Sequence, residues 1–363
     1  MKRFIAVGAL LLAGCSSMQY YAQAVSGHLD VLQRARSIDE VLAADDTSNA
    51  LRAKLEQVRV IRSFAVKELA LPDNGSYRSY ADVERPFVVW NVFAAPEFSL
   101  QPHKSCFPFV GCVSYRGYYN LAEAQHEAAR LQRDGYDVFV GGVPAYSTLG
   151  WFDDPVLNTF VSYPNAELAR LMFHELAHQV AFAQGDTQFN ESFAVAVERE
   201  GLRRWLERHG SDMDRDAYVV RRERREAFIE LVQRYRDKLA VWYAAPVNKD
   251  EMRAGKQHII ENMKTDYVAL KESWNGYTGY DRWFAQGVNN AQFASIVAYS
   301  RHVPAFEALL EREGGDMPKF YAAVQALAAQ DKALRETQLA ELEASRTPHA
   351  VATAAATGAI ARQ

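Results

Sequence analysis

Two histidines four residues apart, with a glutamate beside the first, form the stretch of the sequence best suited to chemistry. They are His174 and His178 in "HELAHQ", and the glutamate is Glu175. On a helix, residues i and i+4 project from one face, so both imidazoles can bind one ion. Glu175 lies around the helix, where it can accept a proton from a metal-bound water without being a ligand. The pattern predicts one zinc ion and metal-assisted hydrolysis. The alternative is that the histidines hydrogen-bond within a helix interface.

A third metal ligand must come from outside this motif. The metzincin pattern HExxHxxGxxH is excluded, because Ala181 and Gln184 occupy its glycine and last histidine positions. A following antiparallel helix offers Glu191, Glu198 and Glu200. The helical rise of about 1.5 Å per residue does not choose among them. Glu191 and Glu198 are seven residues apart and share a face, so one is expected to bind the metal and the other to accept a histidine N–H.

These side chains need a pair of helices to position them. Apolar spacing and capping residues predict helices over 165–184, with Asn165 as N-cap, and over 187–208, with Asp186 or Thr187 as cap. The same spacing predicts further helices over 19–71, 121–134, 215–244, 249–272, 281–312 and 317–344. Short β-like runs fill the rest of 86–150. The predicted fold class is α+β, mostly α, with a small sheet beside a body of long helices.

The 363-residue chain is expected to form a single domain over residues 15–344. Its β-rich part covers about 86–150 and its helical part about 151–344. The small, polar stretch 345–363 is predicted to be disordered. Residues 1–14 are typical of a signal peptide, because Lys2 and Arg3 precede an apolar run that is too short to span a bilayer.

The predicted signal ends in "LAGC", which resembles the bacterial lipobox. We therefore expect lipidation of Cys15, an anchor in the membrane, and a protein that faces the periplasm. The absence of an aspartate after Cys15 resembles the pattern for sorting to the outer membrane. An unmodified export signal is the alternative. In an oxidising periplasm, Cys106 and Cys112 are expected to form a disulfide.

The charge pattern excludes nucleic acid as a partner. The net charge is −4, and no long basic run interleaves with aromatic residues. The arginine-rich stretch 221–225, "RRERR", has helical spacing and acidic neighbours, so it is interpreted as a solvated helix face.

The segments "HELAHQ" and "FNESFAVAVEREG" together resemble the gluzincin aminopeptidases. They are more similar to a family of predicted bacterial zinc aminopeptidases, and the resemblance extends over most of the chain. It implies a zincin-like helix pair in which Glu191 is the third zinc ligand and Glu175 the general base. Glu198 and Asn190 would then support the ligands. The linker between His178 and Glu191 is shorter than in the better-known gluzincins.

The remaining candidates concern the substrate. Gluzincins stabilise the oxyanion with a tyrosine or histidine from outside the helix pair, and Tyr280 and Tyr299 are the best candidates ahead of Tyr277, His258 and His302. The β-rich segment could offer an edge strand to an extended peptide. Asp153, with Asp154, could bind a substrate α-amino group, or form a turn before Pro155. Asn289 could bind substrate backbone, or cap a helix.

The resulting hypothesis is a lipid-anchored zinc aminopeptidase whose partner is a peptide or polypeptide. Aminopeptidase activity is implied by the resemblance, since an endopeptidase would use the same motif. The other alternative is a non-catalytic lipoprotein that keeps zinc for structure and binds an envelope partner. The presence of Glu175 beside the histidines argues for catalysis, because a structural zinc site has no need of a base.

Overall fold

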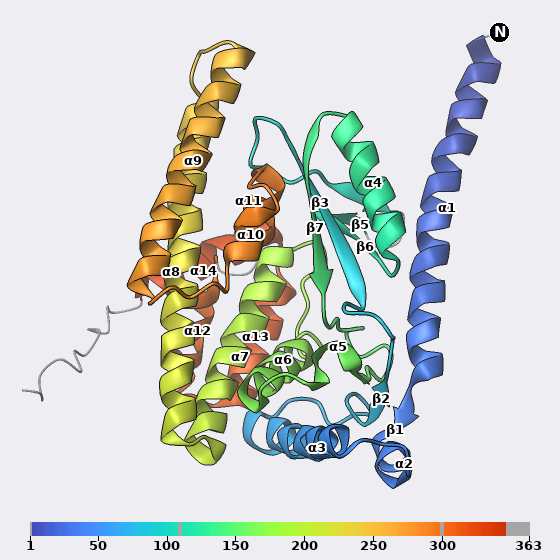
Figure 1. Ribbon diagram of the computed structural model, residues 1–363, viewed down its shortest axis with the longest axis vertical. Coiled ribbons are helices and arrows are strands. Elements are labelled where there is room, and N and C mark those ends of the chain that lie inside the picture. Colours follow the sequence, from blue (N-terminus) through green and yellow to red (C-terminus); the bar gives the residue numbers. More distant parts are fainter. Residues whose placement is uncertain (1, 108–110, 298–300, 346–363) are drawn as a thin grey trace, which may run out of the picture.

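The computed structural model describes residues 2–107, 111–297 and 301–345. This part of the chain is mostly helical with small β-sheets, which confirms the predicted α+β, mostly α class (Figure 1). Within it, no helix has both the length and the apolar composition needed to cross a membrane. The tail predicted to be disordered lies outside the described residues, apart from Ser345.

The main sheet has three antiparallel strands in the order β6-β3-β7: Tyr115–Tyr118, Val89–Pro96 and Tyr136–Val143. Helices α4 (Leu121–Arg133) and α11 (Asn290–Val297) both pack on it, and Figure 1 shows them on opposite sides. Consecutive residues of β3 are therefore buried, as expected for a strand covered on both faces. The strands fall within the predicted β-rich segment.

Two smaller sheets complete the β structure of the described residues. One joins β1 (Arg36–Ser37), β2 (Ser79–Ala81) and β8 (Val156–Leu157). The other pairs β4 (Ser105–Phe107) with β5 (Gly111–Val113). A disulfide joins Cys106 and Cys112, which lie opposite each other in this pair.

The region predicted to be helical over 19–71 contains three helices: α1 (Lys2–Arg34), α2 (Ile38–Ala43) and α3 (Asn49–Leu69). Strand β1 separates the first two because it pairs with β2. The hydroxyls of Ser37 and Ser48 each accept a hydrogen bond from the backbone amide three residues on, and so begin α2 and α3. The strand pairing and the two caps therefore divide a region that apolar spacing alone would predict to be continuously helical.

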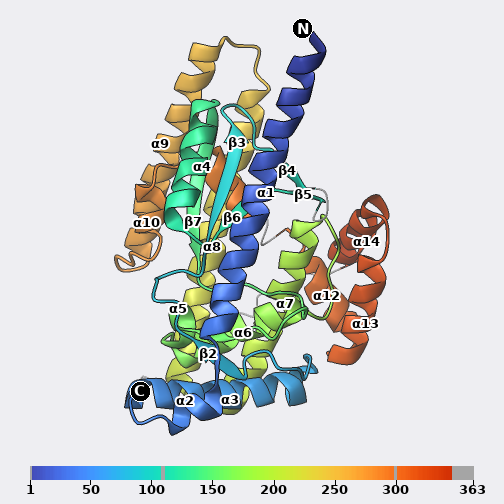
Figure 2. The ribbon, with the colours of Figure 1, turned by 90° about the vertical axis from the view of Figure 1, so that its right-hand side faces the viewer.

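Helix α1 lies along the outer edge of β6 (Figure 2). The backbone N–H of Gly117 donates to the Tyr20 hydroxyl at 3.3 Å, and its carbonyl accepts from Gln23 Nε2 at 3.1 Å. Gly27 permits this close approach, since a Cβ there would lie 2.2 Å from the Tyr119 ring. The β6 edge at Gly117 is thus already paired, and it is not free to receive an extended peptide there.

The centre of the molecule is the antiparallel pair α6 (Asn165–Ala177) and α7 (Thr187–His209), with the short α5 (Asn158–Val161) before it. Helix α3 packs on α6, and α12 (Val303–Arg312) packs on α7. Fully buried phenylalanines from these elements fill the core between them: Phe160, Phe173, Phe189, Phe193 and Phe306. Gly201 lets α7 pack closely, since a Cβ there would lie 2.8 Å from the Phe173 ring.

The helices predicted over 215–244 and 249–272 are α8 (Asp212–Tyr243) and α9 (Lys249–Ser273), which pack as a long antiparallel hairpin at the left of Figure 1. The helix predicted over 281–312 is broken into α10 (Asp281–Ala285), α11 and α12. Gly287 has a φ of +84°, and Asn289 caps α11, so the first break has a local cause. The helix predicted over 317–344 is likewise two, α13 (Met317–Ala328) and α14 (Lys332–Ser345).

Candidate metal centre

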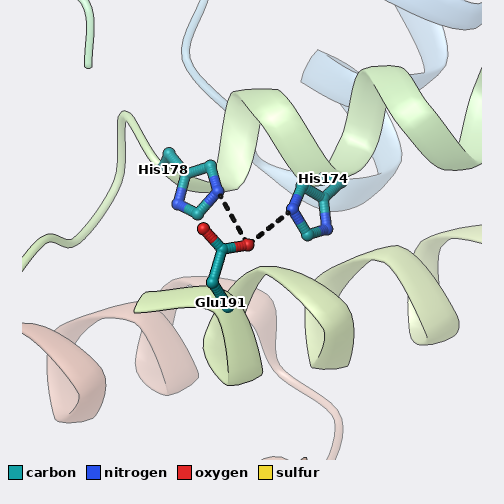
Figure 3. A group of neighbouring side chains, drawn as sticks. All are labelled: His174, His178 and Glu191. Carbon is teal, nitrogen blue, oxygen red and sulfur yellow. Dashed lines mark hydrogen bonds and ion pairs between the residues drawn. The ribbon is translucent and has the colours of Figure 1, made fainter. Parts of the chain in front are cut away.

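His174, His178 and Glu191 converge between α6 and α7 (Figure 3). The two imidazoles project one turn apart from the α6 side, and Glu191 faces them from the second turn of α7. Glu191 Oε2 lies 3.3 Å from His174 Nε2 and 3.8 Å from His178 Nε2. One candidate ligand atom from each residue lies within 4.8 Å of the others, and all three side chains are largely buried.

Helix α6 ends earlier than predicted, at Ala177 rather than Gln184. His178 caps it with φ −60° and ψ −21°, so its side chain still follows the helical face of His174. Gln179 then turns toward the chain before β2: its Oε1 accepts from Asn74 at 2.7 Å and its Nε2 donates to Ser76 at 3.1 Å. These long-range contacts replace the last two turns expected from the spacing.

Asn190 holds the linker rather than a histidine. Its Oδ1 accepts from the backbone N–H of Ala183 at 2.7 Å, and its Nδ2 donates to the carbonyl of the same residue at 2.9 Å. The structure therefore differs from the expectation that Asn190 supports a ligand directly. Because these bonds fix the linker before α7, they help to set the position of Glu191 relative to the two histidines.

Glu198 lies behind His174. Its Oε2 is 2.9 Å from His174 Nδ1 and accepts from Arg170 at 2.9 Å, and its Oε1 accepts from Arg225 at 3.1 Å. Burial raises the pKa of Glu198, but Arg170, His174 and Arg225 together lower it far below the usual range of a carboxyl. An ionised carboxylate can only accept, so Nδ1 of His174 carries the proton and Nε2 faces Glu191.

The charges at the centre suit a cation. Although burial lowers the pKa of His174, hydrogen bonds to Glu191 and Glu198 raise it to about 10. Burial lowers the pKa of His178 to about 4, and its Nδ1 has no hydrogen-bond partner among the described residues. Two buried carboxylates thus surround one imidazole that they hold in its protonated form. Two imidazole nitrogens and a carboxylate oxygen are a donor set typical of zinc.

Glu175 lies half-buried next to His174 at the C-terminal end of α6. Burial, followed by the charges of Glu191, Asp154 and Glu198, raises its pKa to about 7, while His174 opposes the shift. A carboxyl that titrates near neutral pH can both accept and return a proton during a reaction.

Two tyrosines that the sequence did not single out lie toward this centre. Burial raises the pKa of Tyr115, at the start of β6, and the charges of Glu191 and Glu175 add to the shift. Burial also raises the pKa of Tyr77, with the charge of Glu175 as the next cause. Tyr115 belongs to the β-rich segment, whereas Tyr77 lies in the turn before β2. Nothing in their local sequence distinguishes them from the other tyrosines.

The tyrosines predicted to stabilise the oxyanion are not found beside the three candidate metal ligands in the described part of the chain. Tyr280 stacks on Phe228, with ring centroids 3.9 Å apart, and lines a cavity on the α8 side of Glu198. Tyr299 lies outside the described residues. Tyr277 lines the same cavity as Tyr280, with Arg224 over its ring at 4.4 Å.

The residues predicted to bind substrate, Asn289 and Asp153 with Asp154, have different roles in the structure. Asn289 uses its side chain within the fold: its Oδ1 caps α11 and its Nδ2 donates to the Val138 carbonyl at 3.0 Å. This is the capping role named as the alternative. Asp153 is exposed beside Gly75, whereas Asp154 is buried and accepts from the Thr148 N–H at 3.0 Å. Burial raises the pKa of Asp154 to about 6.

Comparison with known proteins identifies a family for this chain. No curated protein and no solved structure matches the chain. One family model does, and it covers residues 19–339, a span that contains both helices of the candidate centre and the β-rich segment. That family is described as "Putative aminopeptidase", and the protein belongs to it.

Proposed function

We propose that the protein is a zinc-dependent aminopeptidase in which His174, His178 and Glu191 hold the metal. The observation that carries the proposal is the buried group of these three side chains, with ligand atoms within 4.8 Å of one another. The family to which the chain belongs, described as "Putative aminopeptidase", also supports the proposal. Glu175 provides the additional carboxyl that hydrolysis needs and that a structural zinc site does not.

The residues present fit a zinc ion. Glu198 accepts the hydrogen bond of His174 Nδ1–H, so Nε2, which faces Glu191, is the nitrogen that would bind the metal after losing its own proton. A zinc ion bound there would polarise the scissile carbonyl and lower the pKa of a water to near neutrality. Glu198, fixed by Arg170 and Arg225, keeps the His174 ring oriented.

The chain's own groups supply the proton transfers. Glu175 accepts the proton of the attacking water and returns it to the leaving amine, a cycle that its position beside His174 supports. Tyr115 and Tyr77 are neutral phenols that lie toward the site carboxylates, and either could donate a hydrogen bond to the developing oxyanion. Of the two predicted acidic residues, the buried Asp154 is the better candidate to bind a substrate α-amino group, since its charge acts on Glu175.

We also propose that the protein is anchored by lipid at Cys15, on the outer membrane, and faces the periplasm. The sequence of residues 2–15 supports this location, as does the Cys106–Cys112 disulfide, because disulfides persist in oxidising compartments. Labelling with a radioactive fatty acid tests the anchor. The native protein should take up label, and Cys15→Ser should not; label in neither would overturn the proposal.

The test of the function combines metal content with cleavage. One zinc per chain is expected in the purified native protein and in Glu175→Gln, and little or none in Glu191→Ala. The native protein should release the first residue from an unblocked peptide, and Glu175→Gln should lose at least about a hundredfold in rate. Glu200→Gln, on the same helix as Glu191, is the matched control and should change neither quantity.

The outcomes separate the alternatives. Equal cleavage of an N-acetylated peptide would replace aminopeptidase by endopeptidase activity. Bound zinc without cleavage of any peptide in a library would favour a non-catalytic zinc protein. Absence of bound zinc in the native protein after zinc is supplied would overturn the proposal altogether.

A further inference from the structure

A cavity of about 570 Å³ adjoins Glu198, and none of the three candidate metal ligands lines it. Its walls come from α6, α7, α8, α11 and the segment before α10. The volume falls in the range of cavities that bind small organic molecules. The function proposed above makes no use of this cavity.

Positive charge dominates the wall. Among the described residues, five arginines and three glutamates line the cavity, which leaves a formal excess of two positive charges. Three of the arginines, Arg221, Arg222 and Arg225, lie within little more than one turn of α8. They belong to the stretch interpreted from sequence as a solvated helix face. The side chains of Arg221 and Arg225 are 38% and 37% exposed, so this face is partly solvated and also lines the cavity.

These three arginines have hydrogen-bonding capacity to spare. Arg221 approaches Glu167 only to 3.7 Å, and its buried Nε has no hydrogen-bond partner among the described residues. The carboxylate beside Arg222, that of Glu226, is 3.9 Å away. Arg225 donates to Glu198 at 3.1 Å. Since each guanidinium carries five N–H donors in a planar fork, the group can receive a carboxylate.

The rest of the wall is apolar and aromatic. Tyr280 lies flat on Phe228, and Tyr218 and Tyr277 add two more rings. Aliphatic side chains complete this part of the wall: Leu202, Ile229 and Ile296. A ligand that fills the cavity must therefore carry an apolar or aromatic body as well as a negative charge.

We propose that this cavity is a binding site for an organic carboxylate with an apolar or aromatic body, of the kind that an amino acid or a peptide C-terminus presents. A carboxylate places less negative charge near Glu167, Glu198 and Glu226, which also face the space, than a dianion such as a phosphate monoester does. The proposal requires neither bound metal nor peptidase activity.

N-acetylphenylalanine is a suitable probe, because it carries the ring and the carboxylate but no free amine. Its amide, N-acetylphenylalaninamide, differs only in lacking the charge. Calorimetric titration into the metal-free full-length protein excludes binding through a metal. We expect the acid to bind and the amide to bind at least about tenfold more weakly, because the amide offers no carboxylate to the guanidinium groups.

The double variant Arg221→Gln/Arg222→Gln should weaken binding of the acid by about tenfold or more. The matched control is Arg236→Gln on the same helix, which lies outside the cavity and contacts Asp237; it should leave binding unchanged. Undiminished binding by the double variant, or equal binding of acid and amide by the native protein, would overturn the proposal. If the double variant does not fold, the acid–amide comparison on the native protein still decides.

Discussion

Glu198 is the residue that joins the candidate ligand shell to the rest of the protein. The residue is 1% exposed, and its carboxylate has three partners: Arg170, His174 and Arg225. Replacing it with glutamine removes the charge and leaves Arg170 and Arg225 without their shared acceptor. We expect Glu198→Gln to lower zinc affinity about ten- to a hundredfold, as loss of a carboxylate behind a ligating histidine does. Competition with a chromogenic chelator measures this affinity.

The same variant should unfold at a lower urea concentration, because breaking a buried ion-pair network costs about 3–5 kcal/mol. Glu200→Gln provides the comparison, since Glu200 contacts Arg203 and Arg204 on its own helix. It should bind zinc like the native protein. Equal zinc affinity in Glu198→Gln and Glu200→Gln would show that Glu198 does not support His174.

The predictability of the site residues depends on how far apart they lie in the sequence. His174, His178 and Glu191 belong to one helix pair, so helical spacing and a family resemblance were sufficient to propose all three. Tyr115, about sixty residues before His174, feels the charges of Glu191 and Glu175 only because the packing of the sheet brings β6 toward the helix pair. No local pattern marks such a residue.

At the scale of elements, the sequence predicted where helices occur better than where they end. The start of α7 was predicted from its cap, Asp186, and α9 matches its predicted range closely. Helix α8 begins three residues earlier than predicted, because Ser211 caps it. The end of α6 was wrong by seven residues. The apolar spacing of the sequence continues beyond Ala177, but the side chain of Gln179 hydrogen-bonds to Asn74 and Ser76. These two residues lie about a hundred positions earlier in the sequence, so the pattern around Gln179 does not predict the contacts.

The start of α7 is also tied to α14. Asp186 caps α7 at the Phe189 N–H, and its Oδ2 accepts from Arg335 at 2.8 Å, with both side chains about 95% buried. Asp186→Asn keeps a capping side chain but removes the charge, so it isolates the ion pair. Because the Arg335 charge stays buried without a counterion, we expect a loss of about 3 kcal/mol in the free energy of unfolding at pH 7.

The effect of Asp186→Asn should depend on pH in a defined direction. Burial raises the pKa of Asp186, but Arg335 and Lys332 lower it below its usual value of 3.8. The stabilisation is therefore fully present above about pH 4, the unfolded-state pKa, and is lost as pH falls through the folded-state pKa. Urea unfolding should give a constant difference from native between pH 5 and pH 8, shrinking below about pH 4. A difference that grows on acidification would contradict the ion-pair explanation.

At the scale of the whole molecule, the candidate metal centre and the arginine-lined cavity share one group. One oxygen of Glu198 faces His174 and the other faces Arg225 of the cavity wall. A carboxylate bound in the cavity would take part of the hydrogen bonding of Arg225. Glu198 would then be a stronger acceptor for His174 Nδ1–H, which makes Nε2 a better metal ligand. The added negative charge favours a cation at the centre as well.

Both effects have the same sign, so N-acetylphenylalanine should tighten zinc binding. For a coupling on the order of 1 kcal/mol, zinc affinity rises about fivefold, and zinc tightens binding of the acid by the same factor. Chelator competition with and without the acid measures the first factor, and the amide should have no effect. Arg221→Gln/Arg222→Gln separates this coupling from direct coordination of zinc by the acid: if the acid still raises zinc affinity in the double variant, the acid coordinates the zinc directly. A rise confined to the native protein and to Arg236→Gln would show that the two sites communicate through the residue they share.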